Sequence, residues 1–97
     1  METKRKKVKY NILTTEGFTE VEGKPIKKME KYGKFCIHEE NDGYWVVDEY
    51  TSGQAVCDGT TQEYTIKKAI DLIKIYGIEQ IKQQIEKSIK RYGVANE

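Results

Sequence analysis

The spacing of the hydrophobic residues changes once along this chain, near residue 60, from a period of two to a period of about 3.6. Before that point, residues 44–50 are the clearest strand, dense in aromatic and β-branched side chains. After it, isoleucines recur every three or four residues, as in amphipathic helices. Strands followed by helices predict an α+β fold: an antiparallel β-meander of three to five strands, then one or two C-terminal helices packed on one face.

A chain of 97 residues holds one modest hydrophobic core, so residues 1–97 are expected to form a single domain. Within it, residues 1–7 are expected to be a flexible basic arm, residues 8–58 to be mainly β, and residues 60–93 to be helical. No apolar run approaches the roughly 20 residues that cross a bilayer, and no secretory signal is recognised, which predicts a cytoplasmic protein.

The residues that begin and end the predicted elements are clear in some places and ambiguous in others. Thr60 is expected to cap the first helix, with Glu63 completing a capping box, and Gly77 is expected to end or kink that helix. Residues 18–31 are ambiguous, because the glycine and proline of Gly23-Lys24-Pro25 suggest a turn between two short strands.

Charged residues are segregated along the chain, although the formal net charge is only +1. Residues 1–38 carry a net charge of +5, and residues 66–97 carry +3. Residues 39–65 contain seven carboxylates and no Lys or Arg. Charge segregation of this kind affects which partners a protein attracts and how they approach it, more than it affects the fold.

Few residues of this chain are candidates for binding a metal or for acting as a nucleophile. Cys36 and His38 are two residues apart on an expected strand, and Cys57 lies two strands later. Zinc sites normally take four ligands with paired spacings, which these residues lack, so both cysteines are expected to be reduced core residues. The glycines match neither a phosphate-binding loop nor a dinucleotide fingerprint. The chain is therefore expected to be non-enzymatic, with no metal and no cofactor.

Four separate segments in the stretch from Gly33 to Ala69 carry a resemblance: Gly-Lys-Phe-x-Ile-His, Tyr-Trp-Val-Val-Asp-Glu-Tyr-Thr-Ser-Gly-Gln-Ala-Val, Gly-Thr-Thr-Gln-Glu, and the Ala-Ile that begins at Ala69. The stretch resembles small accessory proteins of Gram-positive phages and mobile elements. The order of three strands and a helix is also similar to the arm-type DNA-binding domains of phage integrases. Those domains place Lys and Arg on the sheet, whereas residues 39–65 have none. The acidic stretch is instead similar to anti-CRISPR inhibitors.

This resemblance implies a protein of phage or mobile-element origin that inhibits a host protein with a basic nucleic-acid channel, such as a CRISPR effector. Carboxylates on a rigid hairpin beside aromatic rings are expected to mimic the phosphates that such a channel holds. The alternative is that these carboxylates only protect sheet edges from aggregation. The residues expected to contact the partner are Glu39, Glu40, Asp42, Tyr44, Trp45, Asp48, Glu49 and Asp58.

Two other interpretations remain open. The first is a DNA- or RNA-binding module that uses the basic arm 4–9 and one helix face, formed by Lys67, Lys68, Lys74, Lys82, Lys87, Lys90 and Arg91. A pI near 7.7 is lower than is usual for such modules. The second is a homodimer joined through the isoleucine stripe of Ile78, Ile81, Ile85 and Ile89.

Overall fold

The computed structural model describes residues 7–97, so the expected basic arm lies outside the described residues except for Lys7. Five strands precede two helices, with two single 3-10 turns between strands. The elements in chain order are β1 (Val8–Thr14), β2 (Gly17–Pro25), η1 (Lys27–Met29), β3 (Phe35–Glu40), η2 (Asn41–Gly43), β4 (Tyr44–Glu49), β5 (Ala55–Gly59), α1 (Gln62–Tyr76) and α2 (Ile78–Tyr92).

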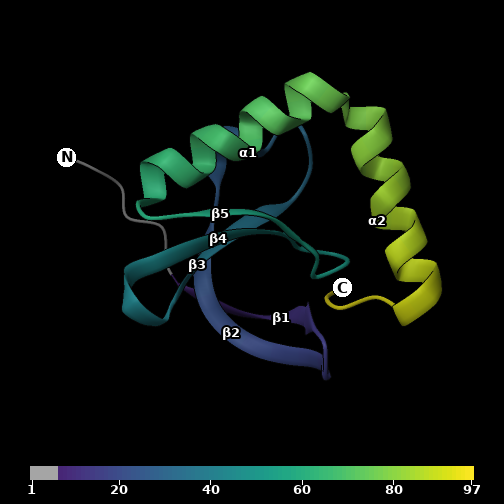
Figure 1. Cartoon of the computed structure of the whole chain (residues 1–97). Coiled ribbons are helices and arrows are strands. Elements are labelled where there is room, and N and C mark those ends of the chain that lie inside the picture. Colours follow the sequence, from purple (N-terminus) through teal and green to yellow (C-terminus); the bar gives the residue numbers. More distant parts are fainter. Residues whose placement is uncertain (1–6) are drawn as a thin grey trace.

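The strands form one sheet in the order β1-β2-β3-β4-β5, and every neighbouring pair is antiparallel. The predicted α+β fold, a meander followed by two C-terminal helices, is confirmed (Figure 1). β1 pairs along its whole length with residues 17–23 of β2, whereas β2 pairs with β3 only from Gly23 to Pro25. The β1–β2 hairpin therefore bends out of line with the other three strands, to the side away from α1 (Figure 1).

The expectation of a turn at Gly23-Lys24-Pro25 is wrong, because these residues are the last three of β2. A Cβ at Gly23 would lie 2.3 Å from the Ile37 carbonyl oxygen, so glycine is needed for the close approach of β2 to β3. Pro25 ends the strand, where its missing N–H costs no ladder hydrogen bond.

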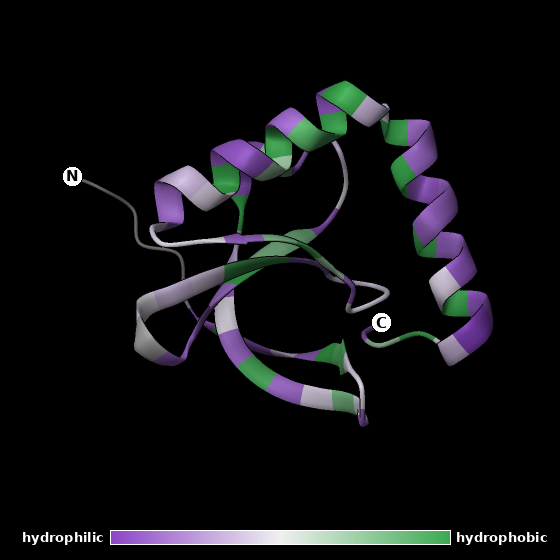
Figure 2. Ribbon diagram, in the orientation of Figure 1, coloured by the Kyte–Doolittle hydropathy of each residue, from purple (hydrophilic) through white to green (hydrophobic). Residues whose placement is uncertain are grey.

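One face of the sheet meets α1 and forms the hydrophobic core (Figure 2). Period-two alternation on β3 and β4 places Phe35, Ile37 and Val47 on this face. Helix α1 contributes Ala69 and Ile73 to the same cluster. The side chains facing the other way are largely polar, and several of them are buried beneath the curved β1–β2 hairpin.

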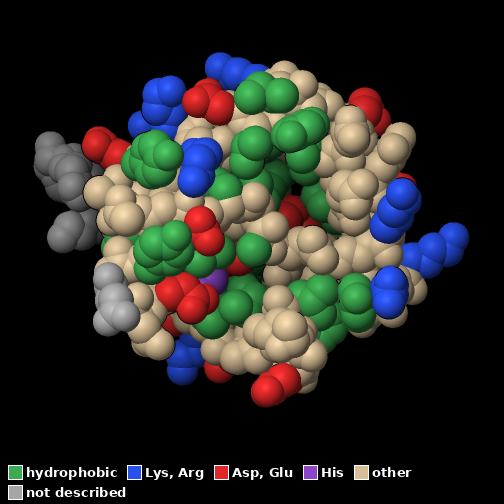
Figure 3. Space-filling view, in the orientation of Figure 1, with side chains coloured by type: hydrophobic (Ala, Val, Ile, Leu, Met, Phe, Trp, Pro, Cys, Tyr) green, Lys and Arg blue, Asp and Glu red, His purple; other side chains and the backbone are tan. Residues whose placement is uncertain are grey.

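The first helix begins one residue later than the sequence suggested. Thr61, not Thr60, is the N-cap, and its hydroxyl accepts a hydrogen bond of 3.1 Å from the backbone N–H of Tyr64. Gly77, at φ 88°, separates α1 from α2 as expected. The isoleucine stripe of α2 is half-buried, and Ile78 and Ile81 pack against the core. Lys and Arg side chains lie on the outer side of both helices (Figure 3).

A C-terminal clasp, formed by Ala95 and Asn96, returns the end of the chain to β1. The Asn96 Nδ2 donates to the carbonyls of Asn11 (2.9 Å) and Tyr50 (2.7 Å), and its Oδ1 accepts from the Asn11 N–H (2.8 Å). The N–H of Ala95 donates to the Thr51 carbonyl at 2.8 Å. The clasp thereby ties β1 to the turn between β4 and β5.

Replacing Val47 with aspartate tests the assignment of the core face. Val47 is fully buried among apolar side chains, so Val47→Asp should destabilise the domain by about 3 kcal/mol or more, out of a total near 5–15 kcal/mol. Val94→Asp is the matched control, because Val94 is 44% exposed and should tolerate the same change. Thermal melts compare the two variants, and an unchanged Tm for Val47→Asp would contradict the assignment.

Candidate functional site

The expected acidic face is only partly assembled at the surface. Glu39, Glu40 and Asp58 are exposed near the end of the β3–β4 hairpin. The hydroxyl of Tyr44, which is 43% exposed, donates to the Asp58 Oδ1 at 3.4 Å. A shallow hollow of about 430 Å³ lies between Glu40, Tyr44 and Asp58, whereas Glu39 lies on the opposite face of β3. The side chain of Asp42 lies outside the part of the structure that is described.

Three other residues expected on that face are not available there. Asp48 is fully buried and Glu49 is 6% exposed. Glu49 accepts hydrogen bonds from the backbone N–H groups of Thr51 (3.1 Å) and Ser52 (2.7 Å), so it stabilises the β4–β5 turn. Trp45 is half-buried and packs against the hydrophobic core. Strand alternation and the curvature of the sheet turn these side chains inward.

Asp48 instead belongs to a polar cluster in which Tyr10, His38 and Asp48 are buried and Glu40 is exposed at the edge. His38 Nδ1 lies 2.7 Å from Asp48 Oδ2, and His38 Nε2 lies 2.8 Å from Glu40 Oε2. The Tyr10 hydroxyl donates to the same Asp48 oxygen at 2.8 Å. Three strands, β1, β3 and β4, therefore meet at one hydrogen-bonded group.

Hydrogen bonding and burial in this cluster favour particular protonation states of His38 and Asp48. Burial disfavours a charged imidazole, but the hydrogen bonds to Asp48 and Glu40 outweigh it and raise the pKa of His38 above the usual 6.5. Burial also raises the pKa of Asp48, against hydrogen bonds from His38 and Tyr10 that lower it. Both donors meet Asp48 Oδ2, and a proton on Oδ1 would find no acceptor. An imidazolium between two carboxylates therefore best satisfies the cluster.

The cysteines lie on opposite faces of the sheet. Cys36 pairs with Asp48 on the polar face, whereas Cys57 pairs with Val47 on the core face and its thiol donates to the Thr65 carbonyl at 3.4 Å. Burial and the neighbouring Asp48 raise the pKa of Cys36 to about 11, so its thiol stays protonated near neutrality. Cys36 and Cys57 therefore do not converge on one ligand.

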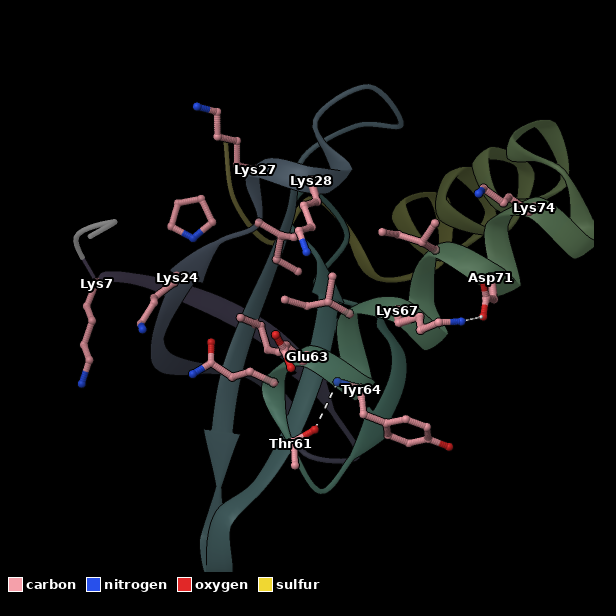
Figure 4. Close-up of a pocket in the computed structure, with 16 residues that line it drawn as sticks. Lys7, Lys24, Lys27, Lys28, Thr61, Glu63, Tyr64, Lys67, Asp71 and Lys74 are labelled. Carbon is pink, nitrogen blue, oxygen red and sulfur yellow. Dashed lines mark hydrogen bonds and ion pairs between the residues drawn. The ribbon is translucent and has the colours of Figure 1, made fainter. Parts of the chain in front are cut away.

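A groove of about 1180 Å³ lies between α1 and the segment formed by the end of β2 and η1 (Figure 4). We call it the lysine groove. Its lysines come from three separate parts of the chain: the start of β1, the β2–η1 segment and α1. They are Lys7, Lys24, Lys27, Lys28, Lys67 and Lys74.

The charge of the lysine groove is strongly positive. Its described lining holds six lysines and two carboxylates, Glu63 and Asp71, a net charge of +4. Lys67 forms an ion pair with Asp71 at 3.2 Å, and Lys28 extends toward the middle of the groove in Figure 4. Lys68, just beside it, lies 5.1 Å from the centre of the Tyr64 ring. Between the lysines the floor is apolar, formed by Pro25, Ile26, Ile37, Ile66 and Ile70.

The structure selects among the basic residues that the sequence suggested. Lys67 and Lys74 line the groove, while Lys82, Lys87, Lys90 and Arg91 lie on α2, away from it. Sequence reasoning missed the β2–η1 lysines, Lys24, Lys27 and Lys28. Their only signal was the phrase Lys-Pro-Ile-Lys-Lys, which lay in the stretch whose structure the sequence left ambiguous.

Fold and groove together define a small α+β domain with a cation-lined, apolar-floored groove. No protein-family model matches the chain, and neither a curated protein nor a solved structure matches it. In residues 7–97, no helix has both the length and the apolar character needed to cross a membrane. Function must therefore be inferred from the chain's own residues.

The chain contains one histidine, so an NMR titration reports His38 alone. We expect a pKa above 6.5 in the folded protein. Because the folded state holds this proton more tightly, the resulting stability is complete below about pH 6.5 and is lost as the pH rises through the folded pKa. Glu40→Gln should lower the pKa of His38, whereas Glu39→Gln, on the opposite face of the same strand, should leave it unchanged. A pKa at or below 6.5 in the wild type would show that the imidazolium is not favoured.

Proposed function

We propose that this domain binds nucleic acid through the lysine groove. The observation that carries the proposal is that lysines from three separate parts of the chain, the residue before β1, the β2–η1 segment and α1, line one concavity. Six lysines and only two carboxylates line this groove, so an anionic ligand would gain by neutralising the excess positive charge.

The electrostatics of the whole chain support this proposal once the fold is taken into account. The net charge of +1 arises partly from acidic residues outside the groove, and Asp48 and Glu49 are buried. A ligand at the groove meets a local charge of +4. Lysine binds phosphate as a compact point charge, and a row of lysines gains from releasing the counterions of a phosphodiester chain.

A binding role is preferred to a catalytic one because the buried acid–base cluster is closed. Both nitrogens of His38 and the hydroxyl of Tyr10 contact carboxylates within the protein. A substrate would find no proton-transfer atom of this histidine available. We further propose a cytoplasmic location, where Cys36 and Cys57 stay as free thiols.

Charge reversal on two sides of the groove tests the proposal. Lys28→Glu combined with Lys74→Glu should weaken binding to DNA at least about tenfold and make the salt slope shallower by roughly two. Lys82→Glu combined with Lys87→Glu, on exposed positions of α2, changes the net charge equally and should alter affinity at most about twofold. Fluorescence anisotropy against salt measures both. Equal losses in the two variants would place binding outside the groove, and no wild-type binding at low salt would refute nucleic-acid binding.

The inhibitor hypothesis keeps a specific supporting observation, the exposed group of Glu40, Tyr44 and Asp58 beside its hollow. As a second candidate function, we propose that this reduced acidic face docks onto a basic nucleic-acid channel of a host protein. Without Asp48 and Glu49 it presents fewer carboxylates than the sequence suggested, so this candidate ranks below the groove.

A charge reversal addresses the second candidate. Asp58→Lys should leave the melt within about 0.5 kcal/mol of wild type, because the side chain is exposed. If the acidic face competes for a basic channel, the wild type should lower the affinity of a purified CRISPR effector for its target DNA, and the variant should lose this effect. Equal inhibition by the two proteins, or none by either, would reject the acidic face as an inhibitory surface.

A further inference from the structure

The floor of the lysine groove is more apolar than phosphate binding requires. Pro25, Ile26 and Ile37 come from the sheet side, and Ile66 and Ile70 come from α1. Ile26 and Ile37 are almost fully buried, while Ile66 and Ile70 keep part of their surface exposed between the lysines. Ile26 and Ile37 belong to the hydrophobic core, so the apolar surface offered to a ligand comes from the exposed parts of Ile66 and Ile70. Phosphates do not use this surface, which indicates that the ligand also has an apolar part.

A nucleic-acid duplex does not suit such a groove. Its phosphates lie on the outside, and the flat faces of its bases are stacked inside, where aliphatic side chains on a floor between two walls cannot reach them. In a single strand the bases are unstacked and can turn toward the protein while the backbone follows a line of positive charge. Lysines on two sides and isoleucines between them match the second arrangement.

The size of the groove and the position of Tyr64 agree with this arrangement. A volume of about 1180 Å³ exceeds the roughly 300–1,000 Å³ of a small-molecule pocket, so a segment of a polymer fits better than a single nucleotide. Tyr64 lies on the first turn of α1, is 53% exposed and projects outward at the rim in Figure 4. Its ring, beside Lys68, offers a surface on which an emerging base can stack.

We propose that the lysine groove is selective for single-stranded nucleic acid, with bases on its isoleucine floor, the backbone along its lysines and Tyr64 as a stacking ring at the rim. This inference rests on the proposed function and specifies its ligand. The groove would select single strands by its shape and by apolar contact with the bases, and it would not distinguish one base sequence from another.

Anisotropy titrations with two probes test the inference. One is a labelled single-stranded oligothymidylate of about 16 nucleotides, which neither pairs nor stacks strongly, and the other is a labelled DNA duplex of the same length. The wild type should bind the single strand at least about tenfold more tightly at equal salt. Tyr64→Ala should weaken single-strand binding about 5- to 100-fold and change duplex binding little. Tyr76→Ala is the matched control, because Tyr76 is 56% exposed on the same helix and lies outside the groove.

The outcomes separate the inference from the proposed function. Equal or tighter binding of the duplex would overturn the inference while nucleic-acid binding stands, and so would equal effects of Tyr64→Ala and Tyr76→Ala. Displacement of the oligothymidylate by polyglutamate of equal charge, at equal concentration, would also overturn the inference, because the groove would then recognise negative charge alone. Binding of neither probe at low salt would remove the proposed function itself. Circular dichroism melts confirm that each variant is folded.

Discussion

The shape of this domain depends on the hydrogen bonds that converge on Asp48. Burial of a carboxylate is costly unless charged or polar donors surround it, and here His38 and Tyr10 supply those donors. Tyr10 lies on β1, two strands away from β3 in the order of the sheet. Its bond to Asp48 therefore holds the β1–β2 hairpin curled over the face opposite α1, where strand pairing alone is limited to three residue pairs between β2 and β3.

The lysine groove depends on the same curl. Lys7 immediately precedes β1 and Lys24 lies near the end of β2, so both are positioned by the hairpin rather than by the helix that they face. In the middle of β1, Asn11 bonds to Asn96, which also bonds to Tyr50 and so joins the hairpin to the β4–β5 turn. Polar bonds thus anchor the hairpin where the hydrophobic core does not extend, and a rigid scaffold of this kind favours a preformed groove.

Local signals in the sequence predicted most of the fold but only part of the site. The change of period near residue 60, the aromatic strand at 44–50 and Gly77 each act over a few residues, and each was interpreted correctly. Gly23 was misinterpreted as a turn residue because a glycine that permits close strand contact looks the same in sequence as one that permits a turn. With that segment unplaced, the lysines that follow it could not be assigned to a site.

Charge counted along a sequence is not charge displayed on a surface. The segment 39–65 holds seven carboxylates in sequence. However, β4 directs Asp48 toward His38, and Glu49 accepts a hydrogen bond from the backbone of the following turn. The lysines show the opposite effect, since residues 7, 24 and 67 are far apart in sequence and meet only after folding. A carboxylate loses its surface role when the fold supplies donors for it, whereas an ammonium group on a long side chain keeps its head in water. In a small sheet that curls on itself, scattered lysines are therefore better candidates for a binding surface than a compact run of acidic residues.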